Sequence, residues 1–182
     1  MRKNIGFISD THGGIEETLK ALEILKTCET IYHLGDVLYH GPRNALPNDY
    51  NPKDLASYLK ERNNIVYIRG NCDSDVDQMV LEKDLTNRAR IVDINGLKTL
   101  LIHGYEESEE DRILYAKKSG IKMIVTGHTH IKVLDKKNGI ILLNPGSTTI
   151  PKDGIASVAM MDDEKIKLID INTKEILKEL EY

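Results

Sequence analysis

Side chains that can bind a metal follow the apolar runs of this chain. In the stretch from Ile124 to His130, a short β-branched run ends at Gly127, and His128 and His130 follow with one residue between them. The glycine lets the backbone turn tightly, and residues two apart in an extended chain share a face. Both imidazoles can therefore reach one polar centre, although two solvated loop histidines would show the same local pattern.

The same arrangement recurs at other predicted strand ends. In chain order, the residues that follow such runs are Asp10, His12, Asp36, Asn71, His103, His128 and His130. Binding sites in α/β sheets form outside the carboxyl ends of strands, so we expect these seven to converge. Carboxylate, imidazole and amide oxygen without thiolate suit Mn, Fe, Co, Ni or Zn, and seven ligands exceed the need of one ion. The set predicts two divalent ions that share a carboxylate.

The N-terminal half that must hold these residues alternates β and α patterns. Apolar β runs over 5–9, 31–34 and 65–68 are separated by a helical pattern over about 15–26 and by a helix that starts at Pro52, with Asn51 as its cap. The loop 37–52, between the second β run and the helix that starts at Pro52, is too long to be a mere connection. Its length suggests a functional or interface loop.

The C-terminal half is mostly hairpins. Asn95-Gly96 and Asn138-Gly139 are strong hairpin turns, and 157–161 with 166–171 predicts a last hairpin. One helix follows a cap at Ser108, and the tail from 174 to 182 fits a strand or a helix. We therefore predict an α/β fold in which two mixed sheets pack face to face with helices outside.

Composition narrows the class of protein further. We expect one domain, 1–182, because 182 residues can bury a sizeable core. A net charge of −4 without a basic stripe argues against a nucleic-acid duplex as partner. Two separated cysteines suit a reducing, cytoplasmic location, and no apolar segment approaches membrane-spanning length. The 37–52 loop leaves a homo-oligomer open.

Taken together, the motifs resemble those of a known family. Asp-x-His, Gly-Asp, Gly-Asn-x-Asp, His-Gly and a closing Gly-His-Thr-His, in this order across residues 10–130, are similar to the motif series of the calcineurin-like metallophosphoesterases. The short chain, the Cys after the asparagine and the stretch from His40 to Pro47 resemble the YfcE-type bacterial phosphodiesterases within that family.

The resemblance implies a four-layer α/β/β/α sandwich and a role for each strand-end residue. Asp10, His12 and His130 would hold one metal, Asn71, His103 and His128 the other, and Asp36 would bridge them, so that Asp36, Asn71 and His103 would be catalytic through the metals. Two ions roughly 3.5–4 Å apart activate a bridging water as hydroxide and stabilise charge on a phosphate ester. Manganese is the metal that the resemblance suggests, with Ni, Co, Fe or Zn also open.

One residue departs from the family pattern. The family's usual Gly-Asn-His turn supplies a histidine that protonates the leaving group, and here Cys72 stands in its place. A thiol with a pKa of about 8.5 is a poor proton donor for an alkoxide, so we expect activity biased toward diesters or good leaving groups. Alternatively, Cys72 simply packs as a small residue in the turn.

Other polar residues have open roles. Arg43 and His40 lie in the loop that leaves Asp36, where they could bind a substrate phosphate, face solvent or face a subunit. His33, inside a β run, is expected to be a hydrogen-bonded core histidine. Asp73 either orients a neighbouring ligand or caps the turn or the short helix after it.

The leading hypothesis is a dinuclear phosphodiesterase, a hydrolase acting on a small phosphodiester. A phosphomonoesterase is the alternative within enzymes, and the missing histidine at position 72 counts against it. A non-catalytic scaffold of the same fold is the alternative outside enzymes. The complete set of seven ligand types argues against it.

Overall fold

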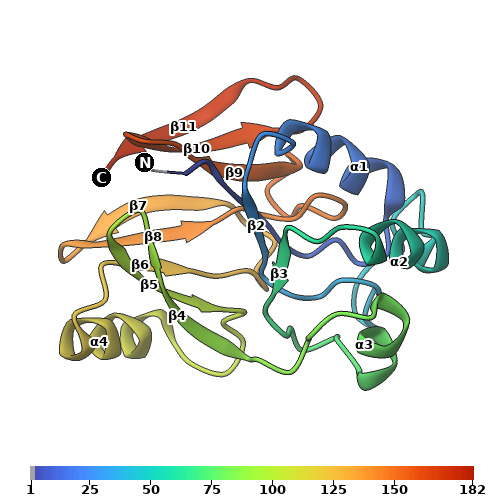
Figure 1. Cartoon of the computed structure of the whole chain (residues 1–182), viewed down its shortest axis with the longest axis horizontal. Helices are drawn as coiled ribbons and strands as arrows, with labels where there is room; N and C mark the ends of the chain where they lie inside the picture. Colours follow the sequence, from blue (N-terminus) through green and yellow to red (C-terminus); the bar gives the residue numbers. More distant parts are fainter. Residues whose placement is uncertain (1–2) are drawn as a thin grey trace.

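Two mixed β-sheets pack face to face in the computed structural model, which describes residues 3–182 (Figure 1). The six-stranded sheet runs in spatial order β11 (Ile176–Glu181), β10 (Lys165–Asp170), β9 (Ser157–Met161), β1 (Ile5–Ile8), β2 (Thr30–His33) and β3 (Ile65–Tyr67). The five-stranded sheet runs β4 (Ala89–Ile94), β5 (Leu97–Ile102), β6 (Met123–Val125), β8 (Ile140–Asn144) and β7 (Val133–Lys137).

Helices cover the outer side of each sheet. The helices are α1 (Ile15–Ile24), α2 (Pro52–Lys60) and α3 (Asp75–Leu81), which follow strands of the six-stranded sheet, and α4 (Glu109–Ser119), which lies beside the five-stranded sheet (Figure 1). This arrangement confirms the predicted α/β/β/α sandwich. Within residues 3–182, no helix combines the length and apolar character that crossing a bilayer requires.

Three apolar cores fill the spaces between the four layers. Leu22 and Leu55 belong to the core that joins α1 and α2 to the six-stranded sheet. Phe7 of β1 and Leu101 of β5 meet in the core between the two sheets, and both are fully buried. Ile113 of α4 packs in a third core on the far side of the five-stranded sheet. Burial on both faces explains why the central strands are short, almost continuous apolar runs.

Parallel pairing brings the carboxyl ends of several strands to one edge. Strands β1, β2 and β3 pair in parallel in one sheet, and β5, β6 and β8 do so in the other. The predicted hairpin turns at Asn95-Gly96 and Asn138-Gly139 are confirmed by the antiparallel pairs β4–β5 and β7–β8. The strand-end residues of both sheets are thereby placed on one side of the sandwich.

Two details depart from or complete the local predictions. Asn51 caps α2 as expected, accepting from the Asp54 amide, whereas the cap of α3 is Ser74 and not Asp73.

The tail, which the sequence left open, is the strand β11. A register shift opposite Leu168 places Leu177 and Leu180, three residues apart, against the inter-sheet core, because a β-bulge breaks the two-residue alternation. That spacing imitates a helix in the sequence.

Candidate metal centre

The seven strand-end residues converge at the edge where the two sheets meet. Two sets of metal-type groups are Asp10 with His12 and His130, and Asp36 with His103 and His128; in each set the ligand atoms lie within 4.8 Å of one another. A third set of the same size joins His12, Asp36 and Cys72, and so links the other two.

Asp36, a member of the second set, also faces the first set. Its Oδ2 lies 3.3 Å from His103 Nε2 and 3.7 Å from His12 Nε2. On the other side, Asp10 Oδ1 lies 3.3 Å from His130 Nε2 and 3.7 Å from His12 Nε2. The Asn71 amide oxygen approaches His103 Nε2 to 3.2 Å. One carboxylate therefore faces both groups of imidazoles.

The backbone of most of these residues is left-handed. Positive φ angles occur at five of the seven: Asp10 (54°), His12 (43°), Asp36 (58°), His128 (67°) and His130 (58°). Residues with side chains rarely adopt this region, and such strain gathers at functional sites. Bonds between loops hold it in place, including Asp10 N to Gly35 O at 3.0 Å and His12 N to Asp36 O at 3.0 Å.

Two glycines allow the loops to approach closely. A Cβ on Gly127 would lie 2.1 Å from the Ser9 hydroxyl, and a Cβ on Gly70 would lie 2.1 Å from Asp36 Oδ1. Neither position has room for a side chain. The glycines of the Gly-His-Thr-His and Gly-Asn motifs thus let three loops pack around one centre.

Backbone carbonyls orient three of the imidazoles. The Nδ1 atoms of His12, His130 and His103 face the carbonyls of Tyr39 (2.7 Å), Ile150 (3.0 Å) and Leu34 (2.5 Å). A carbonyl only accepts, so each Nδ1 carries a proton, and each Nε2 points inward, where it offers a lone pair whenever the ring is neutral. This is the usual support of metal-binding histidines.

The inward-facing atoms fit a cation. His12 Nε2 and His130 Nε2 lie 3.2 Å apart, although both would present lone pairs in the neutral rings. Asp10 Oδ1 is buried and has no hydrogen-bond partner among residues 3–182. Acceptors left to face one another are costly unless a proton or a metal ion lies between them. The donor set fits a borderline divalent ion.

In the metal-free protein, bound protons partly separate these facing acceptor atoms. Burial opposes charge at Asp10, but the adjacent His12 and His130 hold the pKa of its carboxyl well below the ordinary value. Burial likewise opposes charge at His103, yet its pKa is raised to about 9 by the hydrogen bond to Asp36 and the charges of Asp10 and Asp36. His103 is therefore protonated at neutral pH until a metal displaces the proton.

Metal binding at pH 7.5 should release about one proton, because a coordinating imidazole must be neutral. Calorimetric titration of the metal-free protein in buffers of different ionisation enthalpy would measure the number. Apparent affinity should rise with pH up to about 9, where His103 loses its proton unaided. A His103→Gln variant should release fewer protons on binding metal. Binding heats that do not depend on the buffer would contradict the assignment of the released proton to His103.

Two further buried residues support the loops from behind. The Asp73 carboxylate accepts from the amides of Asp36 (2.9 Å), Val37 (2.8 Å) and Gly70 (2.7 Å), and it thereby joins the Gly-Asp loop to the Gly-Asn loop. These contacts match two of the roles left open for Asp73: the bond from Gly70 caps its own turn, and the bond from Asp36 positions the loop of a neighbouring ligand-type residue.

His33 is a neutral core histidine that joins two other loops. Its Nδ1 accepts from Gly35 N (3.2 Å), so Nε2 carries the proton and donates to Thr11 Oγ1 (3.0 Å), which in turn donates to Val37 O. Burial lowers the pKa of His33 to about 3. The ring thus ties the Asp10–His12 loop to the Gly35–Asp36 loop without itself facing a metal.

The pKa of His33 predicts an acid-dependent loss of stability. Below the unfolded value of about 6.5, the unfolded chain binds a proton that the folded chain refuses, so the free energy of unfolding falls as pH drops toward 3, by up to about 1.4 kcal/mol per unit. Urea unfolding of the metal-free protein at pH 7.5 and 5 should show a smaller decrease for His33→Gln. His40→Gln, a loop histidine, is the control. Equal decreases in all three proteins would contradict this role.

A cavity of about 530 Å³ opens beside the centre. Four of the strand-end residues line it, together with Cys72, the loop residues Tyr39, Arg43 and Asn44, and Lys152. His40 is outside the lining, since its ring packs between Tyr39 (4.8 Å) and Tyr50 (5.3 Å). Lys152 and Tyr39 are not among the residues that the sequence predicts for this site. Lys152 belongs to no sequence motif, and it lies at the cavity because its backbone amide donates to the His130 carbonyl (3.0 Å).

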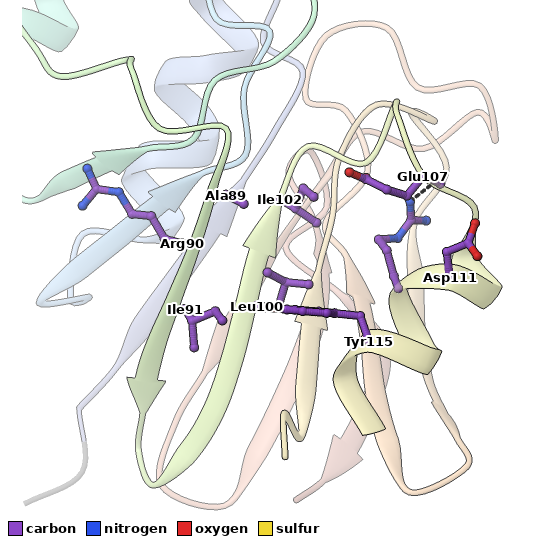
Figure 2. A pocket seen from close by; sticks show the side chains of 9 residues that line it. Ala89, Arg90, Ile91, Leu100, Ile102, Glu107, Asp111 and Tyr115 are labelled. Carbon is purple, nitrogen blue, oxygen red and sulfur yellow. Dashed lines mark hydrogen bonds between the residues drawn. The ribbon is translucent and has the colours of Figure 1, made fainter. Parts of the chain in front are cut away.

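A second hollow, of about 630 Å³, lies between β4, β5 and α4 (Figure 2). Its floor is formed by apolar side chains such as Ile91 and Leu100, with Tyr115 at one side. The Arg112 guanidinium is already bonded to the carbonyls of Gly104 and Glu107. None of the seven strand-end residues lines this hollow, so the metal chemistry belongs to the other cavity.

Fold and site together define a metal-dependent phosphoesterase class, and the chain belongs to the calcineurin-like phosphoesterase superfamily, whose domain matches residues 3–165. It is 36% identical over 178 residues to phosphodiesterase YfcE of Escherichia coli K12, covering 96% of this chain and 95% of that protein. The solved structure of Yfce, a phosphoesterase from E. coli, has a TM-score of 0.88 at 34% identity and covers 98% of both chains. Vps29 of Entamoeba histolytica, solved with zinc, shares the fold, with a TM-score of 0.67 at 18% identity over 98% of both chains.

Proposed function

We propose that this protein is a dinuclear metal-dependent phosphodiesterase that hydrolyses a small phosphodiester. The observation that carries the proposal is the pair of three-residue sets, in which imidazole nitrogens face carboxylate oxygens and Asp36 of one set also lies 3.7 Å from His12 of the other. The 36% identity to a relative named phosphodiesterase supports the reaction class.

Each residue has a role in this proposal. Asp10, His12 and His130 hold one ion, Asn71, His103 and His128 hold the other, and Asp36 contacts both. When bound, two such ions supply an activated water and positive charge for the phosphoryl oxygens. The chain itself contributes position: backbone carbonyls fix three rings, and Asp73 fixes the loop of Asp36. Manganese is our first candidate, and Ni, Co, Fe and Zn suit the same donors.

Cys72 favours esters whose leaving groups need no proton. Burial, and then the charge of Asp36, raise the pKa of its thiol to about 12 in the metal-free protein. Such a group gives up its proton reluctantly, and bound dications would shift it toward thiolate, which has no proton to give. Leaving groups that depart without protonation are therefore the expected substrates.

Metal analysis combined with two substrates tests the proposal. We expect about two ions per chain and a higher kcat/KM for bis(p-nitrophenyl) phosphate than for p-nitrophenyl phosphate. Because both esters release the same p-nitrophenolate, this comparison tests the preference for a diester separately from leaving-group protonation. Preference for the monoester would favour a phosphomonoesterase. Stoichiometric metal without turnover of either ester would favour a non-catalytic scaffold.

A further inference from the structure

We infer that the substrate carries a second anionic group beside the scissile diester, and that Arg43 and Lys152 bind this group. The inference rests on the proposed function and narrows its substrate class to diesters with an additional phosphate or carboxylate. It starts from the cavity beside the metal centre, whose volume of about 530 Å³ is in the range of small-molecule sites.

Both cations line this cavity, yet they reach it from separate segments. Lys152 lies in the segment after β8, and its backbone amide donates to the His130 carbonyl at 3.0 Å. Arg43 lies in the 37–52 loop, two residues after Gly41, whose Cβ position would be 3.0 Å from Cys72 Sγ. Each cation is thus attached to backbone that contacts the site, one beside His130 and one beside Cys72.

Neither cation is neutralised by the protein. Across residues 3–182, the Arg43 guanidinium and the Lys152 ammonium have no hydrogen-bond or ion-pair partner. The acidic group nearest to Lys152 in the chain, Asp153, is engaged by Lys132, which pairs with it at 2.6 Å and also donates its backbone amide at 2.9 Å. The only acidic residue in the 37–52 loop is Asp49, which accepts from the Glu16 amide.

The loop that carries Arg43 is ordered by its own bonds. The Asn44 side chain donates to the His40 carbonyl at 2.8 Å, and the Asn44 amide donates to the Gly41 carbonyl at 3.3 Å. The position of Arg43 beside the cavity is therefore set by the loop and does not depend on a partner for its charge. A preformed loop lowers the entropic cost of binding an anion.

A simple diester does not account for two free cations. It carries one negative charge, and that charge would face the metal ligands that line the same cavity. Arg43 can bind a phosphate by two parallel hydrogen bonds, and Lys152 adds a point charge. A second anion on the same molecule would use both groups, which explains two unpaired cations among the residues that line the cavity.

A matched pair of substrates tests the inference. Thymidine 5′-(p-nitrophenyl phosphate) and its 3′-phosphorylated derivative share the scissile bond and the leaving group and differ only in one additional phosphate. For the natural protein we expect KM to be about tenfold lower for the 3′-phosphorylated ester, with similar kcat, because the additional contact is the same in ground and transition states.

Variants identify the residues responsible. In Arg43→Gln/Lys152→Gln the KM ratio between the two esters should fall to about one, and raising the salt concentration should reduce the ratio only in the natural protein. The control Lys117→Gln/Lys118→Gln changes the net charge equally at the exposed end of α4 and should keep the ratio. A ratio of one in the natural protein, or a ratio that survives in the cavity double variant, would overturn the inference.

Equilibrium binding separates this inference from the proposed function. Calorimetry should give a Kd about tenfold lower for thymidine 3′,5′-bisphosphate than for thymidine 5′-monophosphate, with the difference lost in the cavity double variant. If neither ester is hydrolysed, the phosphodiesterase proposal fails. A binding preference that depends on Arg43 and Lys152 would still support the anion site, and equal binding of both nucleotides would refute it.

Discussion

Replacing Asp36 by asparagine should reduce kcat/KM for bis(p-nitrophenyl) phosphate by roughly 10³-fold or more. The side chain keeps its shape, and the atom at the Oδ1 position can still accept the hydrogen bond from the Cys72 amide, which is 2.8 Å long in the natural protein. What is lost is the charge that faces both His103 and His12. Because one carboxylate serves both sets of ligands, a single neutral substitution should weaken two metal sites together.

Metal content and fold should be measured on the same samples. We expect the Asp36→Asn protein to retain its circular dichroism spectrum while it binds less than the natural number of ions per chain. Asp135→Asn, which neutralises an exposed carboxylate on β7, is the matched control and should behave like the natural protein. Normal metal content with normal turnover in Asp36→Asn would show that Asp36 does not serve the two sites.

Replacing Cys72 by histidine should raise kcat on poor leaving groups by roughly 10–100-fold, since an imidazole can supply the proton that the thiol withholds. The position is suitable: Cys72 lines the cavity, and its sulfur lies within 4.8 Å of ligand atoms of His12 and Asp36. The bond from the Cys72 amide to Asp36 is made by backbone, so the substitution leaves it in place.

The leaving group distinguishes proton donation from other effects. Methyl phenyl phosphate needs protonation of its leaving group more than methyl p-nitrophenyl phosphate does, so its kcat should gain much more in Cys72→His. Cys72→Ser, which stays small and offers no better acid, is the control and should produce no such selective gain. Equal gains on both esters would remove general-acid loss as the explanation for the natural preference.

The sequence by itself determined much of the site. The ligand types and their order are local features, because each residue follows a short apolar run directly, and the Asn-Gly turns specify their hairpins within a few residues. Strand ends of parallel β-α units meet at one edge of a sheet, so convergence of Asp10 and Asp36 follows from the pattern alone, whereas His128 follows a strand of the other sheet and joins them only because the two sheets pack together. The two-sheet architecture follows from the change from alternating β and α to hairpins.

Only the tertiary structure decided what surrounds those residues. Asp73 accepts from amides 36 and 37 residues earlier in the chain, and Lys152 reaches the cavity through a bond to the carbonyl of His130. The β-bulge opposite Leu168 turns two apolar residues of the tail that are three positions apart toward the core, so the tail has the apolar spacing of a helix although it forms a strand. Local periodicity records which face of an element is buried, whereas these roles depend on which distant backbone groups folding brings into hydrogen-bond range.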